Sequence, residues 1–539
     1  MKHFSKRKML PKILSAAVVI AAGGFLAACG GGGTTDSTTT ADSSAATTAA
    51  TTAASTTTAE TTTAKASGSS DVINVGQTRM ADTLNPLEGA ASWSLTSHGI
   101  SETIYKLNEQ GELVSRFVSD IEQVDDNNWT LTLNKGVCFS DGSEVDAAAL
   151  SEGINELMEK NELASAGAAG KMTFTPKEDY VVNVQTENPT HVLQSNLCEY
   201  GIIVFKDLGN DEFSYTGPFV PVNFVADEKI EMEPNKYYPE AETRSNVTLI
   251  KFGDMSAMKM AFEAGEIDIA STITAEVVDM LEKEGLHTET FDAGYQYFLL
   301  CNSKQGLLQD KAVRQAINLG IDREEMMSVL KGGRVATGIF ATYYSFAGEN
   351  PTTRNVEEAK KILDEAGWKE GSDGIREKDG QKLEIRFITY ATRPDLPTLM
   401  QLAVSELEDI GIACKTEVVD NITESCKALD YDLAFYATHT APTGDPAYFL
   451  KMGYLPNGSQ NYIGFDNARM NEIVEEMGKI PLGSERDKLA KEAQQIVYDE
   501  LPHIFVIDPQ WHIGVSDRLQ GYKPYCGDYY TINENLKLK

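Results

Sequence analysis

The sequence has little positive charge. It contains 47 Lys and Arg residues against 80 Asp and Glu residues, which leaves a formal net charge of -33 over 539 residues. A surface this negative repels phosphate backbones and anionic membrane surfaces. We therefore exclude electrostatic binding of nucleic acid and interpret the charge as favouring solubility outside the cell. With 42% hydrophobic residues, most of the chain can still bury a core.

Cysteine is also scarce. The chain has 7 cysteines and no Cys-x-x-Cys pair. Cys29 is assigned below to a lipid anchor. The other six cysteines allow up to three disulfides, but a chain of this length does not need disulfides to fold. Cys138, Cys301 and Cys414 lie in apolar, strand-like runs, where a thiol packs as a small hydrophobic side chain. We expect buried free thiols.

The common catalytic motifs are absent. The sequence has no H-E-x-x-H and no G-x-S-x-G, and no two of its histidines have the spacing of a metal-binding helix. Residues 165–172 resemble a phosphate-binding loop, but Ser165 and Met172 replace the Gly and the Ser or Thr that such a loop needs. We predict that the protein is not an enzyme. The alternative from another class is a lipid-anchored extracellular hydrolase with an acid/base carboxylate pair.

The apolar run near the N-terminus is too short to cross a bilayer. It extends over the 16 residues from Ile13 to Ala28, whereas about 20 are needed. Positively charged residues precede it, and Leu26-Ala27-Ala28-Cys29 resembles the bacterial lipobox. We predict a lipoprotein signal peptide at 1–28 and an acylated Cys29.

The next segment has almost no large apolar side chain. Residues 30–70 are mostly Gly, Thr, Ser and Ala. Such a composition cannot compensate the entropy lost on ordering, so we predict that 29–70 is the lipidated cysteine followed by a disordered linker. This tether would hold the remaining chain beside a membrane on the extracellular face.

The remaining residues indicate a mixed α/β fold. Trp129, Leu131 and Leu133 alternate with polar residues and predict a half-buried strand, and the stretch 146–160 has the spacing of a helix. Later, a strand at 383–387, a helix at about 396–410 and the strand IACKTEVV form a βαβ pattern with a parallel sheet.

Helix start signals are frequent in the second half. Asp310 and Asn355 are predicted to cap helices through their side-chain oxygens, and Gly367 is predicted to end the second of these helices. Ser484 and Asp487 form a capping pattern before a last helix that ends ahead of Leu501.

A series of short strings resembles one family, the extracellular solute-binding proteins of peptide and nickel ABC importers, known as solute-binding family 5. The similarity covers essentially all of 71–539 in the family's order. The strings are DTLNP at 82–86, GISETIY at 99–105, WTLTL at 129–133, FSDGS at 139–143, YTGPF at 215–219, GEIDI at 265–269, VRQAI at 313–317, IDR at 321–323 and EAGW at 365–368.

This resemblance implies a two-lobe, periplasmic-binding-protein-like fold of type II, with an extra subdomain in lobe one. Lobe one would comprise 71–294 and 505–539, and lobe two 295–504. The chain would cross between lobes near 295–298 and 503–506. The ligand would lie between the lobes, which close on it.

The resemblance also implies a function. The protein would be a membrane-anchored receptor of the Gram-positive type that delivers a small solute to ABC permease and ATPase subunits. We expect a monomer with no nucleic-acid partner and no cofactor of its own. The solute would be nickel or another metal in a chelate, or a short peptide.

The solute class depends on one short stretch. Dipeptide-binding members carry an acidic residue where this chain has Pro442, and Ala441-Pro442 before Asp445-Pro446 instead resembles the nickel and metal-chelate branch. We hypothesise that His439 donates an imidazole to a metal carried by a chelator. The alternative is a cleft-wall histidine that only forms hydrogen bonds.

Other residues are candidate ligand contacts. Arg393 follows a strand end and is suited to gripping a carboxylate, or is a surface arginine beside a turn. Trp93 and His98 lie in the loop after the first strand, which reaches the cleft in the family, and Trp93 would stack on the ligand or pack in the core. Tyr343 and Tyr344 are candidate aromatic residues of a lid over the ligand. Asp445 is a further candidate contact, but the simpler interpretation is that it forms the turn before Pro446.

Overall fold

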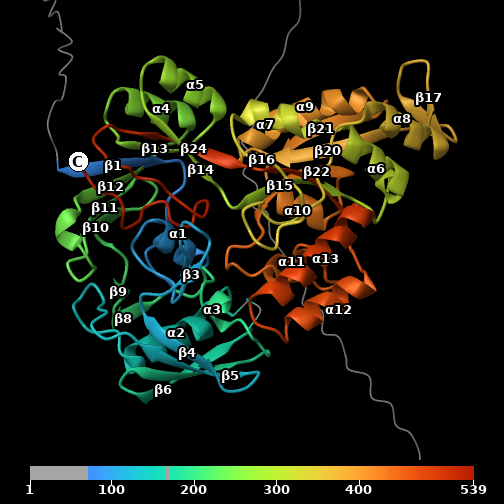
Figure 1. Cartoon of the computed structure of the whole chain (residues 1–539). Coiled ribbons are helices and arrows are strands. Elements are labelled where there is room, and N and C mark those ends of the chain that lie inside the picture. Colours follow the sequence, from blue (N-terminus) through green and yellow to red (C-terminus); the bar gives the residue numbers. More distant parts are fainter. Residues whose placement is uncertain (1–70, 166, 168) are drawn as a thin grey trace, which may run out of the picture. The chain divides into compact units, whose positions relative to one another are not determined.

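The computed structural model describes residues 71–165, 167 and 169–539 (Figure 1). The predicted signal peptide 1–28, the lipidated Cys29 and the linker 29–70 lie outside these residues. Among the helices that are described, none combines the length and apolar character needed to cross a bilayer. The six described cysteines are free; Cys301 is buried as expected, but Cys138 and Cys414 are only half-buried.

Lobe one is built on a mixed sheet with the strand order β10-β11-β12-β1-β13-β24-β14. β1 runs parallel to both β12 and β13, and the other pairs are antiparallel. Helices α4 and α5 pack against this sheet (Figure 1). The bounds are β1 Val72–Gln77, β10 Phe219–Val225, β11 Lys229–Pro234, β12 Asn246–Lys251, α4 Met255–Glu263, β13 Ile269–Ile273, α5 Ala275–Lys283, β14 Thr288–Asp292 and β24 Gln510–Val515.

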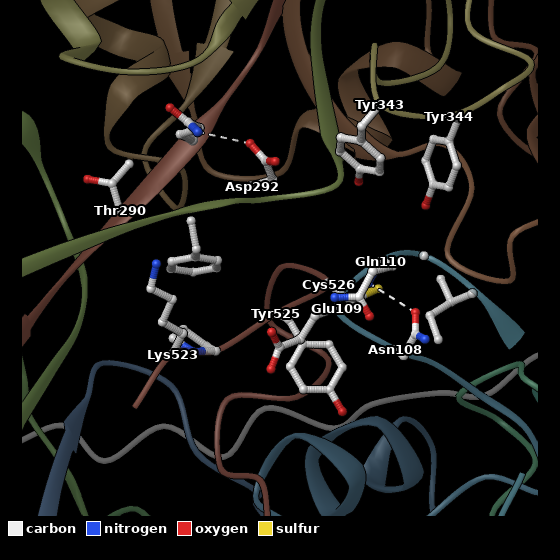
Figure 2. Close-up of a pocket in the computed structure, with 15 residues that line it drawn as sticks. Asn108, Glu109, Gln110, Thr290, Asp292, Tyr343, Tyr344, Lys523, Tyr525 and Cys526 are labelled. Atoms are coloured by element: carbon white, nitrogen blue, oxygen red, sulfur yellow. Dashed lines mark hydrogen bonds between the residues drawn. The ribbon is translucent and has the colours of Figure 1, made fainter. Parts of the chain in front are cut away.

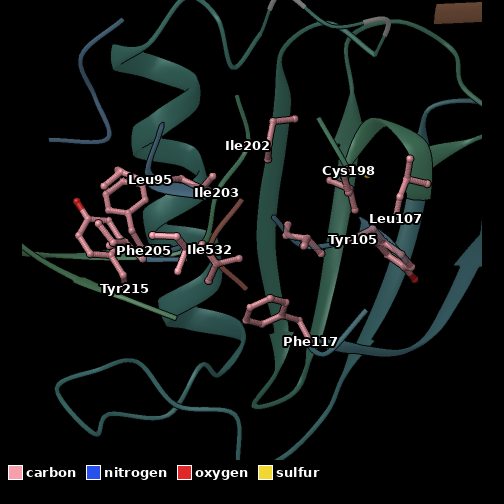
Figure 3. Close-up of a cluster of buried hydrophobic side chains, with 14 of the residues drawn as sticks. Leu95, Tyr105, Leu107, Phe117, Cys198, Ile202, Ile203, Phe205, Tyr215 and Ile532 are labelled. Atoms are coloured by element: carbon pink, nitrogen blue, oxygen red, sulfur yellow. The ribbon is translucent and has the colours of Figure 1, made fainter. Parts of the chain in front are cut away.

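An inserted subdomain of lobe one carries the antiparallel sheet β4-β5-β7-β6, covered by helix α2. Its buried side chains join those of the main sheet in one core, part of which is seen in Figure 3. The bounds of the subdomain and of its neighbouring short elements are α1 Ala91–Ser97, β2 Lys106–Leu107, β3 Leu113–Val114, β4 Val118–Gln123, β5 Asn128–Leu133, α2 Ala147–Lys160, β6 Met172–Glu178, β7 Val181–Thr186, α3 Leu193–Asn196, β8 Phe205–Gly209, β9 Glu212–Tyr215 and η1 Ala241–Thr243.

Lobe two is built on a second sheet with the order β16-β23-β15-β22-β20-β21. Helices on both faces bury two further hydrophobic clusters. The bounds are β15 Tyr295–Cys301, η2 Leu307–Gln309, α6 Lys311–Gly320, α7 Arg323–Leu330, β16 Arg334–Val335, α8 Val356–Glu365, β17 Lys369–Glu370, β18 Arg376–Lys378, β19 Gln381–Lys382, β20 Glu384–Tyr390, α9 Asp395–Glu408, β21 Ala413–Val419, α10 Ile422–Lys427, β22 Leu433–His439, α11 Ala447–Tyr454, α12 Ala468–Met477, α13 Ser484–Glu500 and β23 His503–Asp508.

The local sequence signals are mostly confirmed. β20, α9 and β21 form the predicted βαβ unit, with β20 and β21 parallel in continuous register. Asp310 accepts a hydrogen bond from the Ala312 amide at 3.0 Å, and Asn355 accepts one from the Glu358 amide at 3.0 Å. The predicted cap at Ser484 is wrong, because Gly483 occupies the N-cap position with φ 139° and Ser484 is already the first helical residue.

The chain passes between the lobes twice. β14 ends at Asp292 and β15 begins at Tyr295, so the first crossing runs through Ala293 and Gly294. β23 pairs with β15 as far as Ile507, whereas β24 belongs to the lobe-one sheet. The return crossing is therefore at Pro509, and residues 505–508 belong to lobe two rather than to lobe one as expected. These two short crossings join sheets that have separate cores, which is the arrangement of a hinge.

Candidate functional site

Two cavities lie where the lobes meet. The larger has a volume of about 580 Å³ and is lined by residues within the segment 77–98, by the lobe-two residues 392–394, and by Lys251, Met255, Ser271, Thr272, Asp528 and Thr531. The smaller has a volume of about 340 Å³ and is lined by 107–111, by 523–526 and by tyrosines of lobe two. Both volumes are within the range of small-molecule sites.

The larger cavity brings together three of the predicted residues, Trp93, His98 and Arg393. Trp93 is half-buried on α1, and the guanidinium of Arg79 lies 4.5 Å from the centre of its ring. The cavity wall therefore offers an aromatic face with a cation already placed over it. Sequence reasoning missed Arg79, which lies two residues beyond the end of β1 and follows no recognisable motif.

Arg393 lies at the wall shared by the two lobes. Its Nη2 is 3.3 Å from Oδ2 of Asp528, and its guanidinium lies over the rings of Tyr295 and Trp511 at 4.4 and 4.6 Å. The Tyr295 hydroxyl donates to the other oxygen of Asp528 at 3.1 Å. Burial alone would lower the pKa of Arg393, but Tyr295 and Asp528 raise it above its usual value, so the group stays charged.

His98 is a buried, neutral member of the larger cavity's wall. Its Nε2 accepts a hydrogen bond from the Ala81 amide at 3.1 Å, so the proton of the neutral ring is on Nδ1. Within the described residues that Nδ1 has no hydrogen-bond partner. Burial lowers the pKa of His98 to about 3, which keeps the ring uncharged at neutral pH.

The smaller cavity contains Tyr343 and Tyr344. Figure 2 shows their hydroxyl ends pointing into the space above the loop that carries Asn108 and Gln110. The two rings lie 4.6 Å apart, and the Tyr344 hydroxyl donates to the Ala441 carbonyl at 3.1 Å. The two predicted lid aromatics therefore border a different cavity from Trp93, His98 and Arg393.

His439 borders neither cavity directly. It ends β22, is 5% exposed, stacks on Tyr295 with ring centres 5.4 Å apart and meets the edge of Tyr529 at 5.2 Å. Its Nε2 is 4.0 Å from Sγ of Cys526, a residue that lines the smaller cavity. Burial lowers the pKa of His439 to about 4. Across the described part of the chain, no group of three or more metal-binding side chains is assembled.

Asp445 lies inside lobe two and away from both cavities. Its two carboxylate oxygens accept from Nε and Nη2 of Arg486, each at 2.8 Å, and the Ala447 amide donates to it at 2.9 Å. Both charged partners are buried. This arrangement fits the expected turn and gives the carboxylate a structural partner in place of a ligand.

The chain is similar to known solute-binding proteins. The family model for bacterial extracellular solute-binding proteins, family 5 Middle, matches residues 110–461. The nickel-binding protein NikA of Staphylococcus aureus is 21% identical over 450 residues, which cover 81% of this chain and 89% of NikA. The oligopeptide-binding protein AppA of Bacillus subtilis is 26% identical over 442 residues, which cover 75% of this chain and 80% of AppA.

A solved structure of similar fold is that of NikA from Brucella suis in complex with Fe(III)-EDTA. It superposes with a TM-score of 0.76 at 22% identity, and the match covers 87% of this chain and 100% of that one. At this identity the likeness shows the fold alone. Together with the family model, it confirms the predicted two-lobe α/β class.

Proposed function

Because the chain belongs to the bacterial extracellular solute-binding proteins of family 5, we propose that it captures a small carboxylate-bearing solute in the larger cavity and delivers it to an ABC permease. In this proposal Cys29 carries the lipid that holds the receptor at the cell surface. The solute is either a short peptide or a transition-metal ion complexed by an amino-acid-like chelator. The named relatives NikA and AppA cover these two classes.

The observation that carries this proposal is the charge arrangement of the larger cavity. Each lobe contributes an arginine to its wall, Arg79 from lobe one and Arg393 from lobe two. Arg393 is paired with Asp528, whereas Arg79 has no ion-pair partner in the described part of the chain. An unpaired guanidinium beside an indole ring is suited to a carboxylate, which it can bind through two parallel hydrogen bonds.

The same cavity also offers carboxylates of its own. Asp82 and Glu88 line it, and both are exposed. They supply the negative charge that is missing at Pro442, where dipeptide-binding members carry an acidic residue. A zwitterionic solute would place its ammonium near these two side chains and its carboxylate near Arg79. This feature favours the short peptide as the second candidate alongside the chelate.

A metal in the larger cavity would have to arrive with its own ligands. The described residues assemble no group of three or more side chains that could hold a bare ion. An amino-acid chelator and a short peptide share the carboxylate and amine groups that the cavity matches. The two candidates therefore differ in the metal and not in the contacts with Arg79.

The proposal is tested by thermal shift and calorimetry on the purified protein. The panel contains di- to pentapeptides, Ni²⁺ alone, and Ni²⁺ with excess L-histidine. A solute that binds the folded protein raises its melting temperature by mass action. We expect Arg79→Gln to weaken binding about tenfold or more, since a charge-assisted hydrogen bond is worth about 1.5–3 kcal/mol.

Arg354→Gln is the matched control. Arg354 pairs with Asp409 on lobe two, away from the cavity, and its loss should leave the affinity unchanged. Equal weakening by both substitutions, or no binding by any member of the panel, would contradict the proposal. Mass spectrometry of the recovered solute separates receptor from hydrolase, because a receptor releases its peptide intact.

A further inference from the structure

Two side chains with strong metal affinity face each other across the lobe junction. Cys526 belongs to the C-terminal segment of lobe one and lines the smaller cavity (Figure 2). His439 ends β22 in lobe two. The Cys526 sulfur and Nε2 of His439 are 4.0 Å apart. This site goes beyond the proposed function, which concerns the larger cavity.

The imidazole is held in one orientation. Tyr295 stacks on one face of His439 and Tyr529 meets it edge-on. Gly294 passes so close that a Cβ there would lie 2.6 Å from Nε2, and only a glycine leaves the ring its space. Nδ1 has no hydrogen-bond partner among the described residues, and the thiol is the polar neighbour of Nε2. The ring is therefore positioned to offer Nε2 toward the sulfur.

The thiol is positioned by a strained turn. Cys526 has a φ of 53°, a left-handed conformation that a side chain with a Cβ rarely adopts. The turn is closed by a bridge between Tyr525 and Tyr530, whose rings stack 4.8 Å apart, and the Tyr529 amide donates to the Cys526 carbonyl at 3.3 Å. The surrounding aromatics thus maintain a conformation that presents the sulfur to His439.

The separation matches that of two ligands on one metal ion. Metal–sulfur and metal–nitrogen bonds of about 2.3 and 2.0–2.1 Å place the two atoms roughly 3.6 Å apart at a tetrahedral angle and about 4.3 Å apart in a line. The observed 4.0 Å lies between these limits. Thiolate and imidazole together favour thiophilic ions such as Zn²⁺, Co²⁺, Ni²⁺ and copper over Mg²⁺ or Ca²⁺.

We propose that Cys526 and His439 jointly bind one thiophilic transition-metal ion across the lobe junction. The thiol proton leaves to solvent as the sulfur–metal bond forms, and neutral His439 donates the lone pair of Nε2. The remaining coordination positions would be filled by water or by donor atoms of a solute that enters from the smaller cavity, which Cys526 lines. Because the two ligands come from different lobes, the ion holds the lobes in contact.

Cobalt titration of the reduced, metal-free protein tests the site directly. Co²⁺ bound to a thiolate gives a charge-transfer absorption band in the near ultraviolet, which nitrogen or oxygen ligands alone do not give. We expect one equivalent of Co²⁺ to produce this band. Cys526→Ser should abolish the band, and His439→Gln should weaken binding at least about tenfold, in line with the loss of one ligand.

Cys414→Ser is the matched control, because Cys414 is a half-buried thiol on β21 in lobe two. It should retain the full band. A band that persists in Cys526→Ser, or no band in the unmodified protein, would overturn the inference. If Cys526→Ser does not fold, His439→Gln provides the test. An unchanged cobalt affinity in His439→Gln would also contradict the inference.

Peptide binding separates this inference from the proposed function. Calorimetry with the peptide panel reports on the larger cavity, and Cys526→Ser should leave those affinities unchanged. Loss of the cobalt band with intact peptide binding supports both assignments. Peptide binding without any cobalt band in the unmodified protein refutes the metal site alone.

Discussion

Two aspartate–arginine pairs in this molecule share the same chemistry and differ in position. Asp445 and Arg486 both belong to lobe two, have side chains 5% and 2% exposed and meet through two contacts of 2.8 Å. Asp528 and Arg393 come from different lobes, are 19% and 14% exposed and meet through one contact of 3.3 Å. A pair within one lobe forms whenever that lobe folds. A pair across the junction forms only when the lobes touch.

The surroundings of the two arginines reinforce this difference. Arg486 also donates to the carbonyl oxygens of Met477 and Ile480, so its hydrogen-bonding groups are directed into the lobe. Arg393 lies between aromatic rings from both lobes and borders the larger cavity. We infer that the first pair contributes to the stability of lobe two and that the second contributes to the equilibrium between separated and closed lobes.

The largest expected effect is on the pair within lobe two. Asp445→Asn leaves the Arg486 guanidinium buried without its counter-charge, and breaking a buried pair in this way costs about 3–5 kcal/mol. We expect the free energy of unfolding in guanidinium chloride to fall by that amount. Asp528→Asn, measured in the same way, should cost about 1 kcal/mol or less, because its pair is single and more exposed.

A double substitution sharpens this test. Asp445→Leu combined with Arg486→Met removes both charges, and replacing a buried pair by apolar groups is often close to neutral. The double variant should therefore be more stable than Asp445→Asn. Equal losses for Asp445→Asn and Asp528→Asn would show that the two pairs do not differ as their positions suggest.

The second effect is a pH dependence of stability that comes from His439, a neighbour of the junction pair. Burial lowers the pKa of His439 to about 4, while a histidine in the unfolded chain titrates near 6.5. The uncharged His439 ring therefore contributes fully to the free energy of unfolding well above pH 6.5. This contribution is lost as the pH falls toward 4, and about 2 kcal/mol of it is lost at pH 5. Among the charged neighbours, Asp528 favours protonation of the ring and Arg393 opposes it.

Unfolding measured at pH 6.5 and pH 5 checks this. His439→Gln should reduce the difference between the two values by about 1.6 kcal/mol. His287→Gln is the control, since His287 is an exposed histidine of lobe one beside Glu289 and should change the difference little. An unchanged difference in His439→Gln would contradict the assignment.

Local sequence signals predicted the fold better than the site. The βαβ unit and the caps at Asp310 and Asn355 depend on residues within a few positions of each other, and the structure confirms them. Arg393 follows strand β20, and loops at the carboxyl ends of strands are where α/β proteins place ligand contacts. This rule found one residue of the larger cavity, whereas Trp93 was a candidate through the family resemblance and lies on helix α1 rather than in the expected loop.

The remaining site residues depend on partners far away in the sequence. Asp445 is 41 residues from Arg486, and no local pattern predicts that they pair. Asp528 and Cys526 lie in a C-terminal segment of turns, with no strand or helix after β24 ends at Val515. Their contacts depend on the path that the C-terminal segment takes along lobe one. Local sequence patterns do not predict that path.

The smallest effect concerns the position of the lobes. Removing the junction pair with Asp528→Asn or Arg393→Gln should shift the ligand-free equilibrium toward separated lobes by about fivefold, which corresponds to a pair worth about 1 kcal/mol. Small-angle X-ray scattering of the ligand-free protein should then give a larger radius of gyration for both variants. Arg354→Gln is the control, because Arg354 pairs with Asp409 within lobe two.

Asp445→Asn provides the decisive contrast in this measurement. At a temperature where it remains folded, its radius of gyration should equal that of the unmodified protein, because its pair lies within one lobe. A solute that occupies the larger cavity should return Asp528→Asn to the compact value, since it bridges Arg79 of lobe one and Arg393 of lobe two. If Asp445→Asn expands and Asp528→Asn does not, the two pairs have exchanged the roles that we assign to them.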